Sequence, residues 1–139
     1  MTQRTTPERS AQMARVRSKN TKPELVVRKL AHSLGYRYRL NRRDLPGTPD
    51  LVFPRLKKII FVHGCFWHQH KDANCWRSRI PKTRQDFWIP KLQGNVARDT
   101  RSQDELRRMG WDVLVVWECE TTPSQIDKLK ETISDFLSH

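Results

Sequence analysis

One short stretch of the chain, Phe61 to Cys75, concentrates the side chains most suited to chemistry. Cys65, His70 and Cys75 offer thiolate and imidazole groups, which are ligands that zinc prefers. Upstream, Asp50 follows a Gly-Thr-Pro turn and offers a carboxylate oxygen, the ligand type that magnesium prefers. Because both ligand types occur within one short region, the sequence predicts a magnesium-dependent hydrolytic site braced by zinc.

The charge of the chain indicates what such a site would act on. The 139 residues carry a formal net charge of +12, with a pI near 10.3. Such an excess favours a polyanionic partner, most commonly nucleic acid, over a merely solvated or ribosomal-type basic protein. Charge and candidate metal ligands together indicate a nuclease.

The composition also limits where the protein acts. The length corresponds to one domain with one core. We find no apolar run long enough to span a membrane and no secretory signal at the N-terminus. Three cysteines are an odd number for a disulfide framework, so we expect a cytoplasmic protein. Three cysteines with one histidine would complete a Cys₃His zinc site, although three free cysteines are the alternative.

The elements that must position these residues follow from local patterns. Residues 1–22 carry six basic residues against the single Glu8, a net charge of +5, and are predicted to be a DNA-binding arm. Residues 23–139 form the proposed endonuclease domain. Its first helix follows Thr21, with Glu24 completing a capping box, and ends at Gly35. We expect its apolar stripe to comprise Leu25, Val26, Leu30 and Leu34.

Beyond this helix, period-two and period-3.6 patterns alternate. Strands are predicted over 36–40, with both tyrosines on one face, and over 51–53, 59–62 and 111–117. Residues 63–84 read as irregular. Helices are predicted over 91–109, with Pro90 near the start, and from Pro123 onward, with Ile126, Leu129, Ile133 and Phe136 inward. The fold class is therefore α/β, a mixed sheet flanked by helices.

Asp50 stands where restriction-like nucleases place a catalytic carboxylate. Pro49-Asp50 matches the first half of their PD-(D/E)xK motif. The second half departs from it, because Phe61 and His63 occupy the acidic and lysine positions. A backbone carbonyl can replace the missing ligand, and a histidine can replace the base, because imidazole titrates near neutral pH. The fold is accordingly predicted to have a restriction-endonuclease-like core with a structural zinc site.

Several motifs together resemble one family, the very short patch repair (Vsr) endonucleases, over most of the chain from about Arg9 to Cys119. The resemblance implies an enzyme that nicks one DNA strand 5′ to the thymine of a T:G mismatch, the product of 5-methylcytosine deamination. The motifs are Leu45-Pro46-Gly47-x-Pro49-Asp50, Phe61-x-His63-Gly64-Cys65-Phe66-Trp67-His68, Phe87-Trp88, Asn95-Val96-x-Arg98-Asp99 and Val116-Trp117-Glu118-Cys119.

The resemblance also implies a catalytic role for particular residues. Asp50 and the main-chain carbonyl of Val62 would bind Mg²⁺, and His68 would be the general base. The outer shell of metal-bound waters would be held by His63, Glu24 and Asp99. Structural Zn²⁺ would be bound by Cys65, His70, Cys75 and Cys119. The loop before Cys75 is longer than expected of the family, which leaves Asp72 or His68 as competing zinc ligands.

The aromatic residues near this block are candidates for DNA contact. Phe66, Trp67 and Trp88 have polar and basic neighbours, and such rings can wedge between weakly stacked base pairs. The resemblance places Met13 in the opposite groove, with Lys91 and Asn95 near the mispaired bases. Phe87 and Trp111 are expected to fill the core. Phosphate contacts are expected from Arg77, Arg79, Lys82 and Arg84.

Two other functions are compatible with parts of this pattern. A homing or restriction-type nuclease would use the same core without mismatch preference. A zinc-braced DNA-binding module with a decayed site is less favoured, because a carboxylate at Asp50 would repel phosphates. The expected partners are double-stranded DNA with a T:G mismatch, a cytosine-5 DNA methyltransferase that creates the lesion, and mismatch-repair proteins. We expect a monomer, because one active site nicks one strand.

Overall fold

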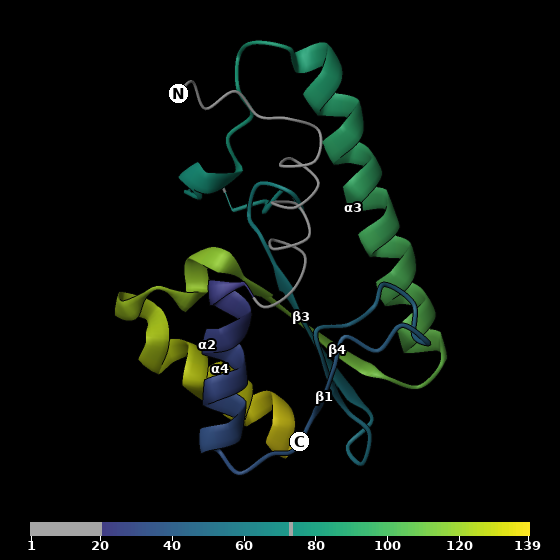
Figure 1. The fold of residues 1–139 in the computed structure, drawn as a ribbon, viewed down its shortest axis with the longest axis vertical. Coiled ribbons are helices and arrows are strands. Elements are labelled where there is room, and N and C mark those ends of the chain that lie inside the picture. The colour runs from purple at the N-terminus through teal and green to yellow at the C-terminus, as the bar shows by residue number, and fades with distance from the viewer. Residues whose placement is uncertain (1–20, 73) are drawn as a thin grey trace, which may run out of the picture.

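The computed structural model describes residues 21–72 and 74–139. Its centre is a four-stranded sheet with the strand order β1-β2-β3-β4 (Figure 1). Strand β2 is antiparallel to both β1 and β3, and β3 pairs with β4 in parallel. The mixed sheet is therefore confirmed. The strands are β1 (Arg39–Leu40), β2 (Leu51–Phe53), β3 (Lys58–His63) and β4 (Asp112–Trp117).

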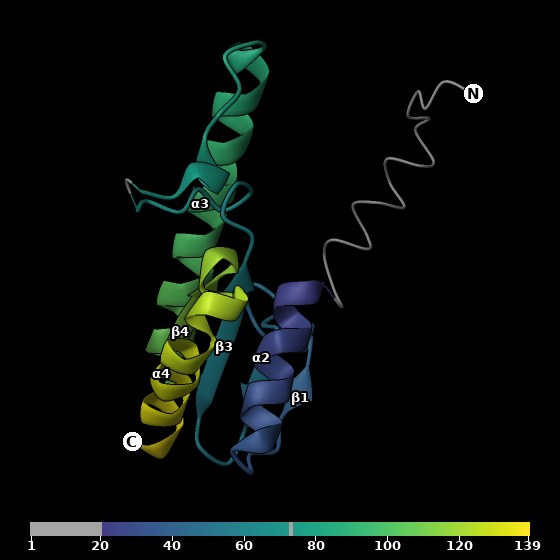
Figure 2. The ribbon, with the colours of Figure 1, turned by 90° about the vertical axis from the view of Figure 1, so that its left-hand side faces the viewer.

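Helices cover both faces of this sheet. Helices α2 and α4 lie side by side against one face, and the long helix α3 lies on the other (Figures 1 and 2). Because β3 and β4 are parallel, α3 is the crossover that joins them. The helices are α2 (Lys22–Ser33), α3 (Gln85–Arg108) and α4 (Ile126–Ser138), and the 3₁₀ turns are η1 (Trp76–Ser78), η2 (Glu118–Thr121) and η3 (Pro123–Gln125).

The core is divided between the two faces. Side chains alternate along a strand, so Ile60 joins the cluster under α2 and α4, whereas Ile59 and Phe61 join the cluster around Leu106 and Trp111. The unbroken apolar run of β3 is thereby explained, because both faces of this central strand are covered. No helix among residues 21–72 and 74–139 is long and apolar enough to cross a membrane.

Helix α2 begins as predicted but faces the core differently. The Thr21 hydroxyl accepts a hydrogen bond from the Glu24 N–H at 3.4 Å, which confirms the cap. The predicted stripe is wrong at Leu25, which is 48% exposed, whereas Val27 and Ala31 are completely buried. The buried face also carries Glu24, 2% exposed, so the helix is turned to bring this carboxylate inward. The prediction missed this rotation because it placed the buried face by the apolar residues alone.

Two predicted boundaries are also wrong. The strand expected over 36–40 is reduced to β1, although Tyr36 and Tyr38 both pack edge-on against Phe53 and so share one face. Helix α3 starts six residues before the predicted Lys91, with Pro90 inside it. An interior proline usually ends a helix. Here the packing of Trp88 against the neighbouring turn supports the first turns.

The C-terminal helix differs less from its prediction. Its first residues form η3, and the α-helix proper begins at Ile126. Leu129 and Ile133 are buried as expected, but the third buried position is Leu137, and Phe136 is only half-buried. The element order of one helix, three strands, a helix, a strand and a helix is confirmed for the described residues.

Candidate active site and metal centre

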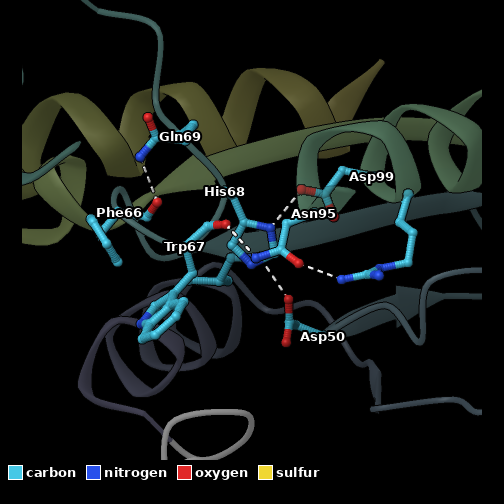
Figure 3. Close-up of polar contacts among 9 residues, drawn as sticks. Asp50, Phe66, Trp67, His68, Gln69, Asn95 and Asp99 are labelled. Carbon is cyan, nitrogen blue, oxygen red and sulfur yellow. Dashed lines mark hydrogen bonds and ion pairs between the residues drawn. The ribbon is translucent and has the colours of Figure 1, made fainter. Parts of the chain in front are cut away.

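Asp50 immediately precedes β2 and points at the neighbouring strand. Its Oδ2 accepts a hydrogen bond from the Val62 N–H at 2.7 Å, and the residue is only 9% exposed (Figure 3). Burial raises the pKa of Asp50 to about 8, and the negative charge of Glu24 adds to the rise. The Val62 N–H and the charge of Arg28 oppose it. Two buried carboxyl groups therefore lie close together where the charge of Arg28 does not offset the effect of burial, and a divalent cation would supply further positive charge.

Glu24 enters this place from α2. Its Oε2 lies 2.9 Å from Arg28 Nη2, one helical turn on, and its side chain is 3% exposed. The two acids thus come from a helix and from a strand that are separate in sequence, and the fold brings them together. The residues present fit a magnesium site, because hard carboxylate oxygens converge there.

The second part of the site is a pair of stacked histidines with an aspartate. The rings of His63 and His68 are 3.8 Å apart and nearly parallel, at 9°. His68 Nδ1 lies 2.6 Å from Asp99 Oδ2 of α3 (Figure 3). With Nδ1 engaged by the carboxylate, Nε2 is the nitrogen left to exchange a proton. Burial, and next the charge of His68, lower the pKa of His63 to about 3, so His63 is neutral at neutral pH.

These two parts meet at the carboxyl end of β3. Asp50 is bonded to Val62, and the adjacent His63 carries the stacked His68. The predicted catalytic residues are thus brought to one edge of the sheet. The arrangement offers a cation site next to a carboxylate-supported imidazole, the combination that hydrolysis of a phosphodiester needs.

A second cluster lies beside the first and contains the four residues that the resemblance implies for zinc. The ligand atoms of Cys65, His70, Cys75 and Cys119 all lie within 4.8 Å of one another. His70 Nδ1 is 3.7 Å from Cys65 Sγ and 3.5 Å from Cys119 Sγ. Ligands around a tetrahedral zinc ion are about 3.6 Å apart when Zn–S is about 2.3 Å and Zn–N about 2.0 Å. The donor set and spacing therefore fit a structural zinc ion.

The protonation of these thiols also fits a metal site. Burial raises the pKa of Cys65 and the pKa of Cys119. Clustered buried thiols resist ionisation on their own, and a bound cation reverses that preference. The Cys65 N–H donates to Glu118 Oε1 at 3.3 Å, which connects the ligand turn to η2.

The two competing zinc ligands lie elsewhere. Asp72 is exposed, and its Oδ1 accepts from the Asn74 N–H at 2.9 Å. His68 belongs to the group with His63 and Asp99. The longer loop before Cys75 is thus accommodated without displacing Cys75 from the cluster.

The aromatic residues form a connected group next to His68. Phe66 lies 5.1 Å from Trp67 and 5.3 Å from Trp88, and the two tryptophans are 6.0 Å apart, all between ring centroids. Phe87 was expected in the core, but it is 46% exposed, 5.0 Å from Trp88. The reason is that α3 starts early and carries its first turns beyond the sheet (Figure 2). Trp111, 7% exposed, is in the core as expected.

The remaining predicted DNA contacts have different positions. Lys91 is exposed on α3. Asn95 Nδ2 donates to the carbonyl of Trp67 at 3.0 Å, and Asn95 Oδ1 accepts from Arg98 (Figure 3). Asn95 therefore supports the turn that carries the aromatic group. Met13 and the rest of residues 1–20, which make up nearly all of the arm predicted over 1–22, lie outside the described residues.

Two residues of the site were missed by sequence reasoning. Gln69 has a left-handed backbone, with φ of 50°, and its Nε2 donates to the carbonyls of Phe66 at 2.7 Å and Ser78 at 3.0 Å. Trp117 packs against His70 and His63. No sequence pattern points to Gln69. Trp117 could have been found, because it ends the strand that leads to Cys119.

Known proteins resemble this chain over most of its length. The family model described as "DNA mismatch endonuclease Vsr" matches residues 2–74. A "Type II nicking enzyme V.XorIIP" of Xanthomonas oryzae is 55% identical over 121 residues, covering 86% of this chain and 87% of that protein. The "Type II nicking enzyme V.NmeAIP" of Neisseria meningitidis is 45% identical, covering 84% of this chain and 81% of that protein.

The "DNA mismatch endonuclease Vsr" of Escherichia coli is 40% identical over 111 residues, covering 80% of this chain and 69% of that protein. The family model matches more than half of the chain, and the relatives are 40% to 55% identical over most of it. Both findings point to the same family. The chain therefore belongs to the Vsr family and is a DNA endonuclease, a hydrolase of phosphodiester bonds.

Proposed function

We propose that the protein nicks one strand of duplex DNA, 5′ to the thymine of a T:G mismatch left by deamination of 5-methylcytosine. The observation that supports this most directly is the meeting of Asp50 with the His68–Asp99 pair at one sheet edge, beside an aromatic group. The relatives add that one such protein is named a mismatch endonuclease and others nicking enzymes.

The proposed mechanism assigns one role to each side chain. Asp50 and the carbonyl of Val62 would hold Mg²⁺, which would supply polarisation of the phosphate and neutralisation of developing charge. His68 accepts the proton of the attacking water at Nε2 as the water oxygen bonds to phosphorus; one P–O ester bond breaks, and the leaving sugar oxygen takes a proton from solvent. Asp99 holds the imidazole by its bond to Nδ1 at 2.6 Å and stabilises the imidazolium that forms.

Two further groups, His63 and Glu24, support this step. Together with Asp99, which then has a second role, they would orient the waters around the cation. His63 remains neutral and so stacks on His68 without like-charge repulsion before the proton moves. We also infer that the core is restriction-endonuclease-like, with Asp50 in the place of its first motif carboxylate.

The zinc ion has a structural role in this proposal. Bound by Cys65, His70, Cys75 and Cys119, it ties the irregular segment after β3 to the end of β4. That segment carries little buried apolar surface, because most residues between 71 and 87 are exposed or half-buried. A metal therefore replaces the core that the segment cannot form.

The choice of a mismatch is assigned to the aromatic group. Phe66, Trp67 and Trp88 insert between base pairs, where a weakly stacked T:G pair yields at a lower cost than a normal pair. Lys91 and Asn95 lie near the mispaired bases, and Met13 enters the opposite groove. The basic segment 1–22 binds phosphates, which gives affinity but little sequence choice.

The proposed setting follows from the reaction. A monomer has one catalytic site and so nicks one strand. It acts at the nucleoid, in the cytoplasm of a bacterium, on lesions produced at the sites of a cytosine-5 DNA methyltransferase, and mismatch-repair proteins are its functional partners. The relatives support this, because those described here come from bacteria.

The test is nicking of labelled duplexes that carry a central T:G pair in varied sequence contexts, with magnesium or with EDTA. We expect a magnesium-dependent nick on the T strand alone, and the preferred context identifies the methyltransferase. Equal cutting of matched DNA would instead favour a restriction or homing nuclease. Binding without any cutting would favour a DNA-binding module.

A further inference from the structure

Trp117 lies between the two clusters of the site. It is the last residue of β4, and in the parallel register of β3 and β4 it pairs with His63. The chain then continues into η2, which carries Cys119. One strand end therefore serves both the catalytic histidines and the candidate zinc ligands.

The side chain of Trp117 contacts a ring on each side. Its indole is stacked on His70, with centroids 4.3 Å apart and planes at 11°. It meets the ring of His63 edge to face, at 5.2 Å and 78°. His63 in turn stacks on His68 at 3.8 Å. The four rings form a continuous series, called here the ring column, from the cysteine cluster to the proposed general base.

Each end of the ring column is also held by polar groups. At one end, His70 Nδ1 lies 3.7 Å from Cys65 Sγ and 3.5 Å from Cys119 Sγ. At the other end, His68 Nδ1 is bonded to Asp99. Polar contacts at one ring nitrogen, Nδ1 in both histidines, leave an imidazole free to tilt about that atom. A ring packed on its face removes this freedom, so the column fixes both imidazoles.

Core filling does not account for this position. Trp117 is half-buried, and among the described residues it is in neither of the two core clusters. Its backbone N–H donates to Glu120 Oε1 at 2.7 Å, which fixes the strand end at which the ring projects. The aromatic contacts of the indole are with two histidines, one from each cluster.

We propose that Trp117 is a positioning residue that couples metal occupancy of the Cys65–His70–Cys75–Cys119 site to the orientation of the catalytic imidazole of His68. The role given to His68 rests on the proposed function. When zinc holds His70, the indole packs on a fixed ring. The fixed indole in turn holds the orientation of His63, and His63 holds that of His68. Loss of zinc loosens His70 and, through the column, misorients His68 even though the Asp50 site is intact.

Three variants separate coupling from stability. Trp117→Leu removes the flat ring from the column, whereas Trp117→Phe keeps a smaller one. Val113→Ala is the matched control, because Val113 lies on the same strand and packs against the core cluster around Leu106 and Trp111. The variants are compared at equal distance below their melting temperatures, so that a general loss of stability affects all of them alike.

The first two measurements do not depend on activity. In cobalt-substituted protein, Trp117→Leu should shift the cobalt(II) absorption bands and weaken metal affinity roughly tenfold, as loss of a group that orients a ligand does. Trp117→Phe should stay near the wild type. In NMR spectra of the imidazole nitrogens, removing zinc from the wild type should shift His68. Trp117→Leu with zinc bound should reproduce part of that shift.

The third measurement is nicking of T:G duplexes. Trp117→Leu should lower kcat roughly tenfold and leave KM for DNA unchanged, and Trp117→Phe should restore most of the loss. Unchanged cobalt bands and His68 resonances in Trp117→Leu would overturn the coupling, as would equal effects of Val113→Ala. If the wild type fails to nick DNA, the proposed function fails, while the cobalt and NMR readings still decide whether Trp117 couples the clusters.

Discussion

The two clusters at the carboxyl end of β3 are neighbours but are built in different ways. The proposed catalytic cluster rests mainly on regular structure: Asp50 precedes β2, His63 ends β3, and Asp99 lies on α3, whereas His68 comes from the turn after β3. The zinc cluster rests mostly on irregular chain, since Cys65 and His70 lie in a turn and a loop after β3. One is positioned by backbone hydrogen bonds and core packing, and the other needs its own ligand to become ordered.

This difference assigns separate tasks to the two metals. A catalytic group must be held within a few tenths of an ångström, and strands or long helices do this best. A loop that carries an aromatic wedge must reach beyond the sheet, where little apolar surface is available to order it. The proposed zinc ion would give the loop a fixed shape through four side chains. The comparison predicts that the Asp50 site can be damaged without loss of zinc, and that loss of zinc leaves the Asp50 site intact while it disturbs His68.

The largest effect is expected from Asp50→Asn. The variant loses the charge that holds the cation while keeping an oxygen to accept from the Val62 N–H. Because metal-bound charge stabilisation supplies several kcal/mol, and about 1.4 kcal/mol is tenfold in rate, nicking should fall by roughly 10³-fold or more. Nicking of a T:G duplex in magnesium measures this, and zinc content should stay at the wild-type level. Wild-type activity would remove Asp50 from the mechanism.

The same variant has a stability signature that shows it is folded. The pKa of Asp50 is raised from 3.8 to about 8 in the folded protein. The folded state therefore binds a proton that the unfolded state releases, and metal-free wild type loses stability as the pH rises between these values. Asp50→Asn removes this loss, so in EDTA at pH 7 its melting temperature should exceed that of the wild type. A lower melting temperature would contradict the burial of this charge.

A smaller effect is expected from the histidine–aspartate pair. His68→Ala removes the proposed base and should lower kcat by about 10²- to 10⁴-fold. Asp99→Asn keeps the shape but no longer stabilises the imidazolium, so its loss should be smaller and should follow the same direction. Single-turnover nicking separates these losses from binding. Equal KM values in both variants and the wild type are expected, and a change in KM alone would indicate a DNA-binding role instead.

The zinc cluster is tested by Cys119→Ser. Serine is a poor zinc ligand, so the variant should release zinc, lower the melting temperature and expose the segment after His70 to proteolysis. The Asp50 site should keep its magnesium affinity, because its contacts lie on β2, β3 and α2. Metal analysis and limited proteolysis measure the two effects. A full zinc content would rule out Cys119 as a ligand.

Much of this arrangement was predictable, and the reasons are physical. Strand positions follow from apolar periodicity, so β2, β3 and β4 were found to within a residue or so, and His63 was placed at a strand end. The four proposed zinc ligands could be predicted from the family resemblance, because soft ligands at a strand exit are chemically distinctive. The fold brings these four residues together. The order of elements followed from the same patterns.

The failures share one cause, which is tertiary packing. The start of α3 was missed because an interior proline, here Pro90, usually ends a helix. The contacts of Trp88 with Phe66 and Trp67 explain why α3 continues through Pro90. The inward face of α2 was misassigned because Glu24 is buried beside Asp50, a position that apolarity cannot reveal. The pair of hydrogen bonds from Gln69, called here the Gln69 clip, depends on the carbonyls of Phe66 and Ser78, which are distant in sequence from one another.

The aromatic group of Phe66, Trp67 and Trp88 depends on both clusters, because the turn that carries Phe66 and Trp67 lies between proposed zinc ligands and beside the proposed catalytic residues. Trp67→Ala should lower the preference for T:G over T:A duplexes by roughly tenfold, since an aromatic ring stacked on a base contributes about 1–3 kcal/mol. Total phosphate affinity should change less. Competition binding with both duplexes measures the ratio. If affinity for both duplexes falls equally, the ring does not sense the mismatch.

The smallest effect is expected from Gln69, which joins the aromatic turn to the segment that carries Cys75. Gln69 lies between His68 and His70, and its amide ties the carbonyl of Phe66, in the aromatic turn, to that of Ser78, beyond the zinc ligand Cys75. Gln69→Leu has a similar volume but cannot donate, and each lost hydrogen bond costs about 0.5–1.5 kcal/mol. These bonds orient the turn without making the chemistry, so mismatch preference should fall a few-fold while zinc content and kcat on saturating T:G duplex stay near wild type. Gln125→Leu, an exposed glutamine far along the chain before α4, is the control for adding a surface leucine. If Gln69→Leu instead loses zinc, the clip belongs to the metal centre, and the two regions are less separable than their construction indicates.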